Sequence, residues 1–199
     1  MMNFARVISF LLSPLFVLLP VPYILVSKFT DNHIYAVKWM VFSYMFILAV
    51  AAFIGIGVLL GIFSNFDVSK KEQRPLLFSF TAIVIFCYLA SLLILDGPKI
   101  LFVGVFGFIL GLIILFIVNR WIKASVHLGI LTSTLLLMCI AYGAYYFFLL
   151  LLIPVLAWSR IKMKEHTLLE TMVGTMLGAL MTLMVYTISK YFLAGILYN

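Results

Sequence analysis

The sequence predicts an all-α integral membrane protein whose helices cross the bilayer six or seven times. Hydrophobic residues make up 66% of the chain and charged residues 10%, whereas a soluble domain carries about 25% charged residues. Mean hydropathy is correspondingly high, at +1.29. Apolar runs of about 20 residues, the length of a membrane-spanning helix, recur from end to end. The alternating pattern of a membrane β-barrel is not found in the sequence, so helices are expected to satisfy the backbone in lipid.

The apolar runs predict helices that together form one domain. The first run contains Pro14, Pro20 and Pro22, so we expect its helix to be kinked. The third run follows Arg74-Pro75, and proline is favoured in the first turn of a helix. The predicted spans are 4–28, 34–64, 76–95, 100–119, 126–142, 144–158 and 168–196.

The long apolar run 128–158 has two interpretations, one overlong helix or two short helices that bend near Tyr142-Gly143. Polar residues cluster at 67–75, 120–127 and 158–170. Two short helices would return the third cluster to the membrane face of the first two, whereas one helix would place it on the opposite face. We therefore expect two helices here and seven crossings in all.

The net charge of +7 comes from basic residues in the short connections. Beside membrane spans, such residues favour anionic headgroups and phosphorylated lipids as partners, and no nucleic acid. Once the candidate site residues are set aside, positive charge is divided too evenly between the two faces to predict which one is cytoplasmic. The oligomeric state is likewise not predicted.

The polar clusters contain residues suited to phosphate chemistry. His166 and Glu170 lie four apart and share a helix face, so the carboxylate can hold the imidazole. Fixed cations and a hydroxyl can hold the oxygens of a phosphoryl group. One histidine can attack phosphorus while another protonates the departing oxygen. The candidate residues are Lys71, Arg74, Lys123, Ser125, His127, Arg160, His166 and Glu170.

Two glycines continue the four-residue step of His166 and Glu170 along the last predicted helix. Gly174 and Gly178 have GxxxG spacing, which allows two helices to pack closely. The face that carries the histidine is therefore predicted to be a helix-packing face as well.

The third cluster resembles a motif of the type-2 phosphatidic acid phosphatases (PAP2), a superfamily of membrane lipid phosphatases and related acid phosphatases. That motif is Ser-Arg, five residues, His, three residues, Asp. The chain has Ser159-Arg160, five residues, His166, three residues and Glu170, with glutamate for aspartate.

The other two clusters resemble the remaining PAP2 motifs less closely. Ala124-Ser125-Val126-His127 keeps the serine and histidine of Pro-Ser-Gly-His. Arg74-Pro75 matches the end of Lys, six residues, Arg-Pro, but Asp67 stands in the lysine position and Lys70 or Lys71 must substitute. The resemblance covers about 67–178 and is closest to a compact prokaryotic branch of the superfamily.

The resemblance implies a role for each candidate residue. His166 would be the nucleophile, oriented by Glu170, and His127 would be the acid for the leaving group and then the base for water. Lys71, Arg74, Lys123, Ser125 and Arg160 would bind the phosphoryl oxygens. No metal or other cofactor is implied. The implied core is 65–199, preceded by a helix pair at 1–64, in the cell membrane of a prokaryote.

The expected function is hydrolysis of a lipid phosphomonoester or diphosphate through a phosphohistidine intermediate. The candidate substrates are isoprenoid diphosphates such as an undecaprenyl carrier, phosphatidylglycerol phosphate and phosphatidate, and we favour an isoprenoid diphosphate. Two alternatives remain, a phosphotransferase on the same scaffold and a non-catalytic lipid-binding or transport protein. The altered first motif and Val126 favour the non-catalytic alternative, whereas the two histidines, Arg160 and an acid at 170 favour an enzyme.

Overall fold

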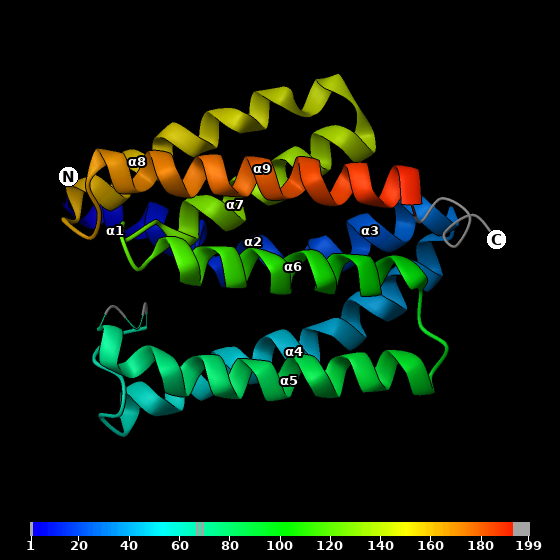
Figure 1. The fold of residues 1–199 in the computed structure, drawn as a ribbon, viewed down its shortest axis with the longest axis horizontal. Coiled ribbons are helices and arrows are strands. Elements are labelled where there is room, and N and C mark those ends of the chain that lie inside the picture. Colours follow the sequence, from blue (N-terminus) through cyan, green and yellow to red (C-terminus); the bar gives the residue numbers. More distant parts are fainter. Residues whose placement is uncertain (1, 67, 69, 193–199) are drawn as a thin grey trace.

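The computed structural model describes residues 2–66, 68 and 70–192, and over these residues the chain is helical without strands (Figure 1). The helices run from one end of the molecule to the other and back. In order they are α1 (Met2–Leu11), α2 (Pro14–Leu18), α3 (Val21–Thr30), α4 (His33–Leu59), η1 (Lys71–Gln73), α5 (Arg74–Ile94), α6 (Lys99–Val118), α7 (Val126–Tyr142), η2 (Ala144–Leu151), α8 (Leu152–Lys162) and α9 (Leu168–Phe192).

The predicted multi-pass architecture is confirmed. Within the described residues, five helical segments are long and apolar enough to cross a membrane: His33–Leu59, Arg74–Ile94, Lys99–Val118, Ala144–Lys162 and Leu168–Lys190. The bent segment from α1 to α3 makes a possible sixth. Helix α7 is apolar but has 17 residues, somewhat fewer than the roughly 20 that span the hydrocarbon core. Seven crossings therefore stay a prediction.

The predicted kink in the first span is confirmed. Its chain bends by 42° between Met2–Leu18 and Val21–Thr30. Pro14 begins α2, and Pro20 stands immediately before α3. Proline lacks the N–H that would continue the preceding helix, so each break falls where a proline begins the next one.

The prediction that the second span reaches residue 64 is wrong, because α4 ends at Leu59. Gly61 then adopts a left-handed conformation with φ of 73°, which glycine reaches without steric cost. Phe63 folds back onto α4 and packs so closely on Gly57 that a Cβ there would collide with its ring. The apolar residues after Leu59 therefore cover the end of the helix instead of extending it.

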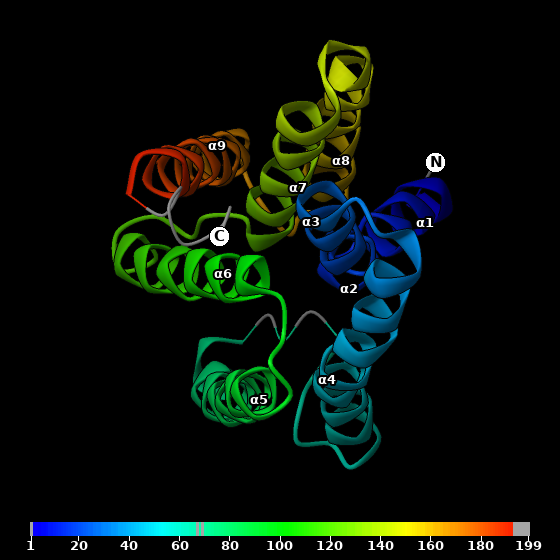
Figure 2. The same ribbon diagram turned by 90° about the vertical axis from the view of Figure 1, so that its right-hand side faces the viewer.

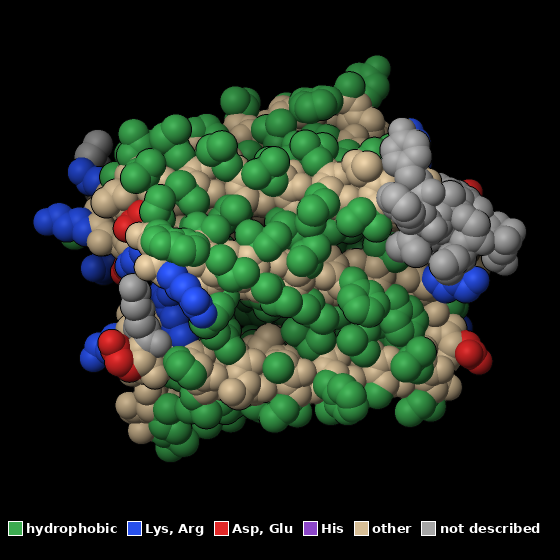
Figure 3. All heavy atoms as spheres, viewed as in Figure 1, with side chains coloured by type: hydrophobic (Ala, Val, Ile, Leu, Met, Phe, Trp, Pro, Cys, Tyr) green, Lys and Arg blue, Asp and Glu red, His purple; other side chains and the backbone are tan. Residues whose placement is uncertain are grey.

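The run 128–158 is divided into two helical segments, as expected, and the break falls at Gly143. The second segment continues to Lys162, beyond the predicted end at 158. The φ of 99° at Gly143 ends α7, and the chain reverses into η2 and α8. This reversal returns the connection before α9 to the end of the molecule where the connections before α5 and α7 lie (Figure 1). Lysine and arginine side chains gather at that end, beside a largely hydrophobic surface (Figure 3).

Helices α7 and α9 pack through small residues, so the predicted role of Gly174 and Gly178 is confirmed. A Cβ on Gly174 would collide with the Ser125 carbonyl oxygen, and one on Gly178 with the Gly129 carbonyl oxygen. Ser133 Oγ donates to the Gly178 carbonyl at 2.9 Å. Figure 2 shows α7 flanked by α9 on one side and by α8 on the other.

Candidate functional site

His166 lies in the short connection between α8 and α9, at the polar end of the molecule. The connection turns sharply: the Glu165 N–H donates to the Arg160 carbonyl at 3.1 Å, and Lys164 has a φ of 59°. Thr167 follows and α9 begins at Leu168. The turn therefore places the imidazole directly before the N-terminus of a long helix.

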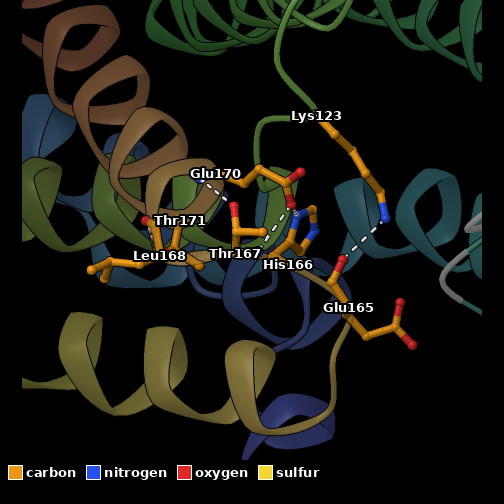
Figure 4. Close-up of polar contacts among 7 residues, drawn as sticks. All are labelled: Lys123, Glu165, His166, Thr167, Leu168, Glu170 and Thr171. Carbon is orange, nitrogen blue, oxygen red and sulfur yellow. Dashed lines mark hydrogen bonds and ion pairs between the residues drawn. The ribbon is translucent and has the colours of Figure 1, made fainter.

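Glu170 makes two contacts with the residues that precede α9 (Figure 4). Its Oε2 lies 3.0 Å from His166 Nδ1 and also accepts the Thr167 N–H at 3.1 Å. Thr167 Oγ1 in turn accepts the Glu170 N–H at 3.3 Å. Threonine followed three residues later by glutamate is a capping box. This capping box was not predicted, although its spacing is readable in the sequence.

The environment of His166 favours a neutral imidazole. Its side chain is 8% exposed. Burial lowers the pKa of His166 below its usual 6.5, and the positive charges of Arg160 and Lys123 lower it further, against the opposing effect of Glu170. With Nδ1–H donated to the carboxylate, the lone pair of the neutral ring is on Nε2. Nε2 makes no hydrogen bond within the part of the chain that the structure describes.

The second polar cluster joins the third through two hydrogen bonds. Lys123 Nζ donates to the Glu165 carbonyl at 3.0 Å (Figure 4), and the Ser125 N–H donates to the Glu170 carbonyl at 3.1 Å. The Ser125 side chain is fully buried, and its Oγ has no hydrogen-bond partner among the described residues. The structure thus brings Lys123, Ser125, His166 and Glu170 together.

Arg160 is buried between α8 and the N-terminal helix α1. Its side chain is 2% exposed, and Nη1 donates to Ser9 Oγ at 2.8 Å. The adjacent Ser159 Oγ donates to the Ala5 carbonyl at 2.6 Å. Ser9 was not predicted as part of the site. Its only signal in the sequence is a hydroxyl within an apolar run.

His127 lies in the first turn of α7, and Ser125 is the residue immediately before that helix. Residues four apart share a face of a helix. The residue one turn further along that face, Leu131, packs in a cluster with Leu156 of α8. Arg160 lies one turn beyond Leu156, so His127 and Arg160 extend the same α7–α8 interface towards the polar end. The imidazole is buried, with 8% of His127 exposed.

Arg74 has different neighbours from the residues around His166. Its Nε donates to the Val68 carbonyl at 3.4 Å. It also lines a cavity of about 140 Å³ between α5 and α6, together with Phe78, Phe116, Asn119 and Arg120.

Part of the first cluster lies outside the described residues, namely Asp67, Ser69 and the side chain of Lys71. Whether Lys70 or Lys71 takes the lysine position of the first motif therefore stays open.

Within residues 2–66, 68 and 70–192, no group of three or more His, Cys, Asp and Glu side chains is arranged to hold a metal ion.

No protein-family model, curated protein or solved structure matches this chain.

Proposed function

We propose that the chain is a membrane lipid phosphatase that hydrolyses a lipid phosphomonoester or diphosphate, with His166 as the nucleophile. One observation carries the proposal: the imidazole of His166, 8% exposed, is held by a carboxylate through Nδ1, 3.0 Å from Glu170 Oε2. Burial lowers the pKa of this ring, as do the positive charges of Arg160 and Lys123, which favours its neutral form. A neutral Nε2 is a nucleophile, and fixed cations offset the charge of a phosphoryl group in the transition state. The motif resemblance to the PAP2 superfamily supports the same assignment.

In the proposed first step, His166 Nε2 attacks phosphorus and the bond from phosphorus to the lipid oxygen breaks. His127 gives its proton to that departing oxygen. In the second step His127 takes a proton from water, and the resulting hydroxide breaks the phosphorus–nitrogen bond. Inorganic phosphate leaves, and His166 returns to its neutral form.

Glu170 stabilises the intermediate in this mechanism. Once Nε2 bonds to phosphorus while Nδ1 keeps its proton, the ring is cationic. The carboxylate 3.0 Å from Nδ1 then makes a charge-assisted hydrogen bond. Arg160 and Lys123 neutralise the phosphoryl oxygens, and the buried Ser125 hydroxyl, which has no partner among the described residues, can donate to one of them.

An apolar groove between α6 and α9 supports an isoprenoid chain as the lipid part of the substrate. The groove has a volume of about 620 Å³ and is lined from Lys99 to Ile113 on α6 and by Val185 and Ile188 on α9. These residues lie mostly in the half of each helix remote from His166. A leaflet is about 15 Å deep, so an acyl chain that starts at the site reaches the near end of the groove at Ile113. A long polyprenyl chain also reaches its far end at Lys99.

A second candidate function, non-catalytic lipid binding, is favoured by the partners of the two cations. Arg160 is bonded to Ser9 and Lys123 to the Glu165 carbonyl, so each also links two segments of the fold. Both hydrogen bonds would stabilise the fold in the same way in a protein that catalyses no reaction.

The experiment that separates the two candidates measures phosphate release from isoprenoid diphosphate, phosphatidylglycerol phosphate and phosphatidate in detergent micelles. The wild type, His166→Ala and His127→Ala are compared, with Lys164→Gln as a control that changes an exposed charge on the same connection. We expect release by the wild type and the control alone. Equal release by His166→Ala would exclude the mechanism, and no release by the wild type on any lipid would favour the binding protein.

A further inference from the structure

The cavity between α5 and α6 has the composition of an anion site. It lies where α5 begins and α6 ends, and two of its five lining residues are Arg74 and Arg120. Within the part of the chain that the structure describes, the lining residues include no carboxylate. Two guanidinium groups on one small cavity repel each other, and an anion between them would remove that repulsion.

Both guanidinium groups are held in place by the protein. Arg74 Nε donates to the Val68 carbonyl at 3.4 Å, and its terminal nitrogens make no hydrogen bond to another of the described residues. The Arg120 guanidinium carbon lies 5.5 Å from the centre of the Phe116 ring, within the range of a cation–π contact. Prior positioning of the cations reduces the entropy that a ligand must overcome.

Asn119 adds a hydrogen-bond acceptor to the two cations. Its Oδ1 is buried and has no hydrogen-bond partner among the described residues. A buried carbonyl without a donor is unfavourable, and phosphate oxygens without protons cannot supply one. A ligand that carries a hydroxyl group beside its phosphate would satisfy both the arginines and Asn119.

The remaining lining residues indicate that the ligand is a lipid. Phe78 and Phe116 are 39% and 53% exposed, on helices whose outer surfaces are apolar. Lysine and arginine side chains gather beside that apolar surface at the polar end of the molecule (Figure 3). A lipid whose headgroup is held by the arginines would therefore place its chains on these two aromatic rings at the membrane interface.

We propose that this cavity binds the phosphate group of an anionic membrane lipid whose headgroup also carries a hydroxyl, as phosphatidylglycerol does. Arg74 and Arg120 hold the phosphate, Asn119 Oδ1 accepts the hydroxyl hydrogen, and the chains lie on Phe78 and Phe116. The site is separate from His166, and it retains its lipid whether or not His166 is a nucleophile.

The test measures lipid binding in phosphatidylcholine nanodiscs that contain phosphatidylglycerol or phosphatidylmethanol, a phosphodiester of the same charge without a headgroup hydroxyl. Native mass spectrometry then counts the anionic lipid that stays bound. We expect Arg120→Gln to lower phosphatidylglycerol affinity at least about tenfold, as the loss of a charged hydrogen bond predicts. Asn119→Leu should remove the preference for phosphatidylglycerol over phosphatidylmethanol. Arg120 is exposed, so its substitution leaves the fold intact, and thermal unfolding in detergent verifies this.

Lys164→Gln is the matched control, because Lys164 is a cation at the same end of the molecule that does not line the cavity. Equal phosphatidylglycerol affinity for the wild type and Arg120→Gln would overturn the proposal. Equal wild-type affinity for the two lipids would overturn the role of Asn119. If millimolar inorganic phosphate displaces phosphatidylglycerol and this competition depends on Arg120, the ligand is free phosphate and not a lipid.

Discussion

Glu170 and Thr167 hydrogen-bond each other's backbone N–H groups across the first turn of α9, at 3.1 and 3.3 Å. The same carboxylate oxygen also holds His166 Nδ1 at 3.0 Å. One side chain therefore starts a helix and orients an imidazole. Glutamate or glutamine closes a capping box, and of the two only glutamate also supplies a negative charge to the imidazole.

Glu170→Gln separates the two roles of this side chain. Glutamine also closes a capping box, so we expect the melting temperature in detergent to stay within experimental error. The negative charge that stabilises a cationic His166 is lost, and turnover should fall about 100-fold or more. Thermal unfolding and phosphate release are measured on the same preparation.

Thr167→Ala is the matched control for that substitution, with the opposite pattern. It removes the hydroxyl that caps the Glu170 N–H and should cost about 1 kcal/mol of stability, while the carboxylate remains beside His166. A Thr167→Ala protein that loses as much turnover as Glu170→Gln would show that helix capping, and not charge, explains the effect.

The pKa of His166 determines the acid limb of the pH profile. Burial lowers this pKa below 6.5, so the neutral nucleophile should persist below pH 6.5, and kcat/KM should fall only at lower pH. As pH falls, the unfolded chain binds this proton before the folded protein does. The contribution of His166 to the free energy of unfolding is therefore complete above pH 6.5, and it is lost as pH falls from 6.5 through the lower pKa of the folded state.

Glu170 opposes this lowering, so Glu170→Gln should move the pKa of His166 further down. Titration of ¹³C-labelled histidine by NMR, with His33 and His127 assigned by substitution, measures the value directly. A wild-type His166 pKa above 6.5 would contradict the electrostatic account.

Close packing of α7 on α9 predicts a large effect at Gly178. A methyl group there would collide with the Gly129 carbonyl oxygen, so Gly178→Ala should cost about 1–3 kcal/mol through forced separation of the helices. Gly111→Ala is the control, since a Cβ at Gly111 has nothing within 4 Å. Thermal unfolding in detergent should rank the two variants in that order, and equal melting temperatures would refute the packing argument.

Ser9 should position Arg160 for phosphate. Ser9→Ala removes the acceptor 2.8 Å from Arg160 Nη1, and we expect KM to rise several-fold with a smaller change in kcat, with recovery in Ser9→Thr. Ser159→Ala serves as the control, because it removes another α1–α8 hydrogen bond and leaves the Arg160 contact in place. Equal kinetics for the two alanine variants would assign Ser9 to helix docking alone.

The sequence predicted the fold wherever hydropathy decides it. Long apolar runs predicted the helices from α4 to α9 to within a few residues at most of their described ends, and Tyr142-Gly143 predicted the division of the run 128–158. The predicted end of the last span, residue 196, lies outside the described residues. The end of α4 was missed because Ile62 and Phe63 are apolar, and only the left-handed Gly61 shows that the chain turns back.

The candidate site was predictable only within a short stretch of sequence. The four-residue spacing of His166 and Glu170 predicted their contact, since it depends on one helical turn. The contact of Arg160 with Ser9 joins residues 151 positions apart, and no local pattern encodes it. The structure also places Arg74 beside Arg120 and Asn119, and the sequence did not predict these neighbours.

The most direct measurement of the central claim is a rapid quench of the protein with ³²P-labelled lipid phosphate, followed by protein gel analysis under alkaline conditions. Phosphohistidine survives alkali and is hydrolysed by acid. We predict an acid-labile label on the wild type and no label on His166→Ala. A label that persists in His166→Ala, or phosphate release by a wild type that never carries a label, would contradict the assignment of His166 as the nucleophile.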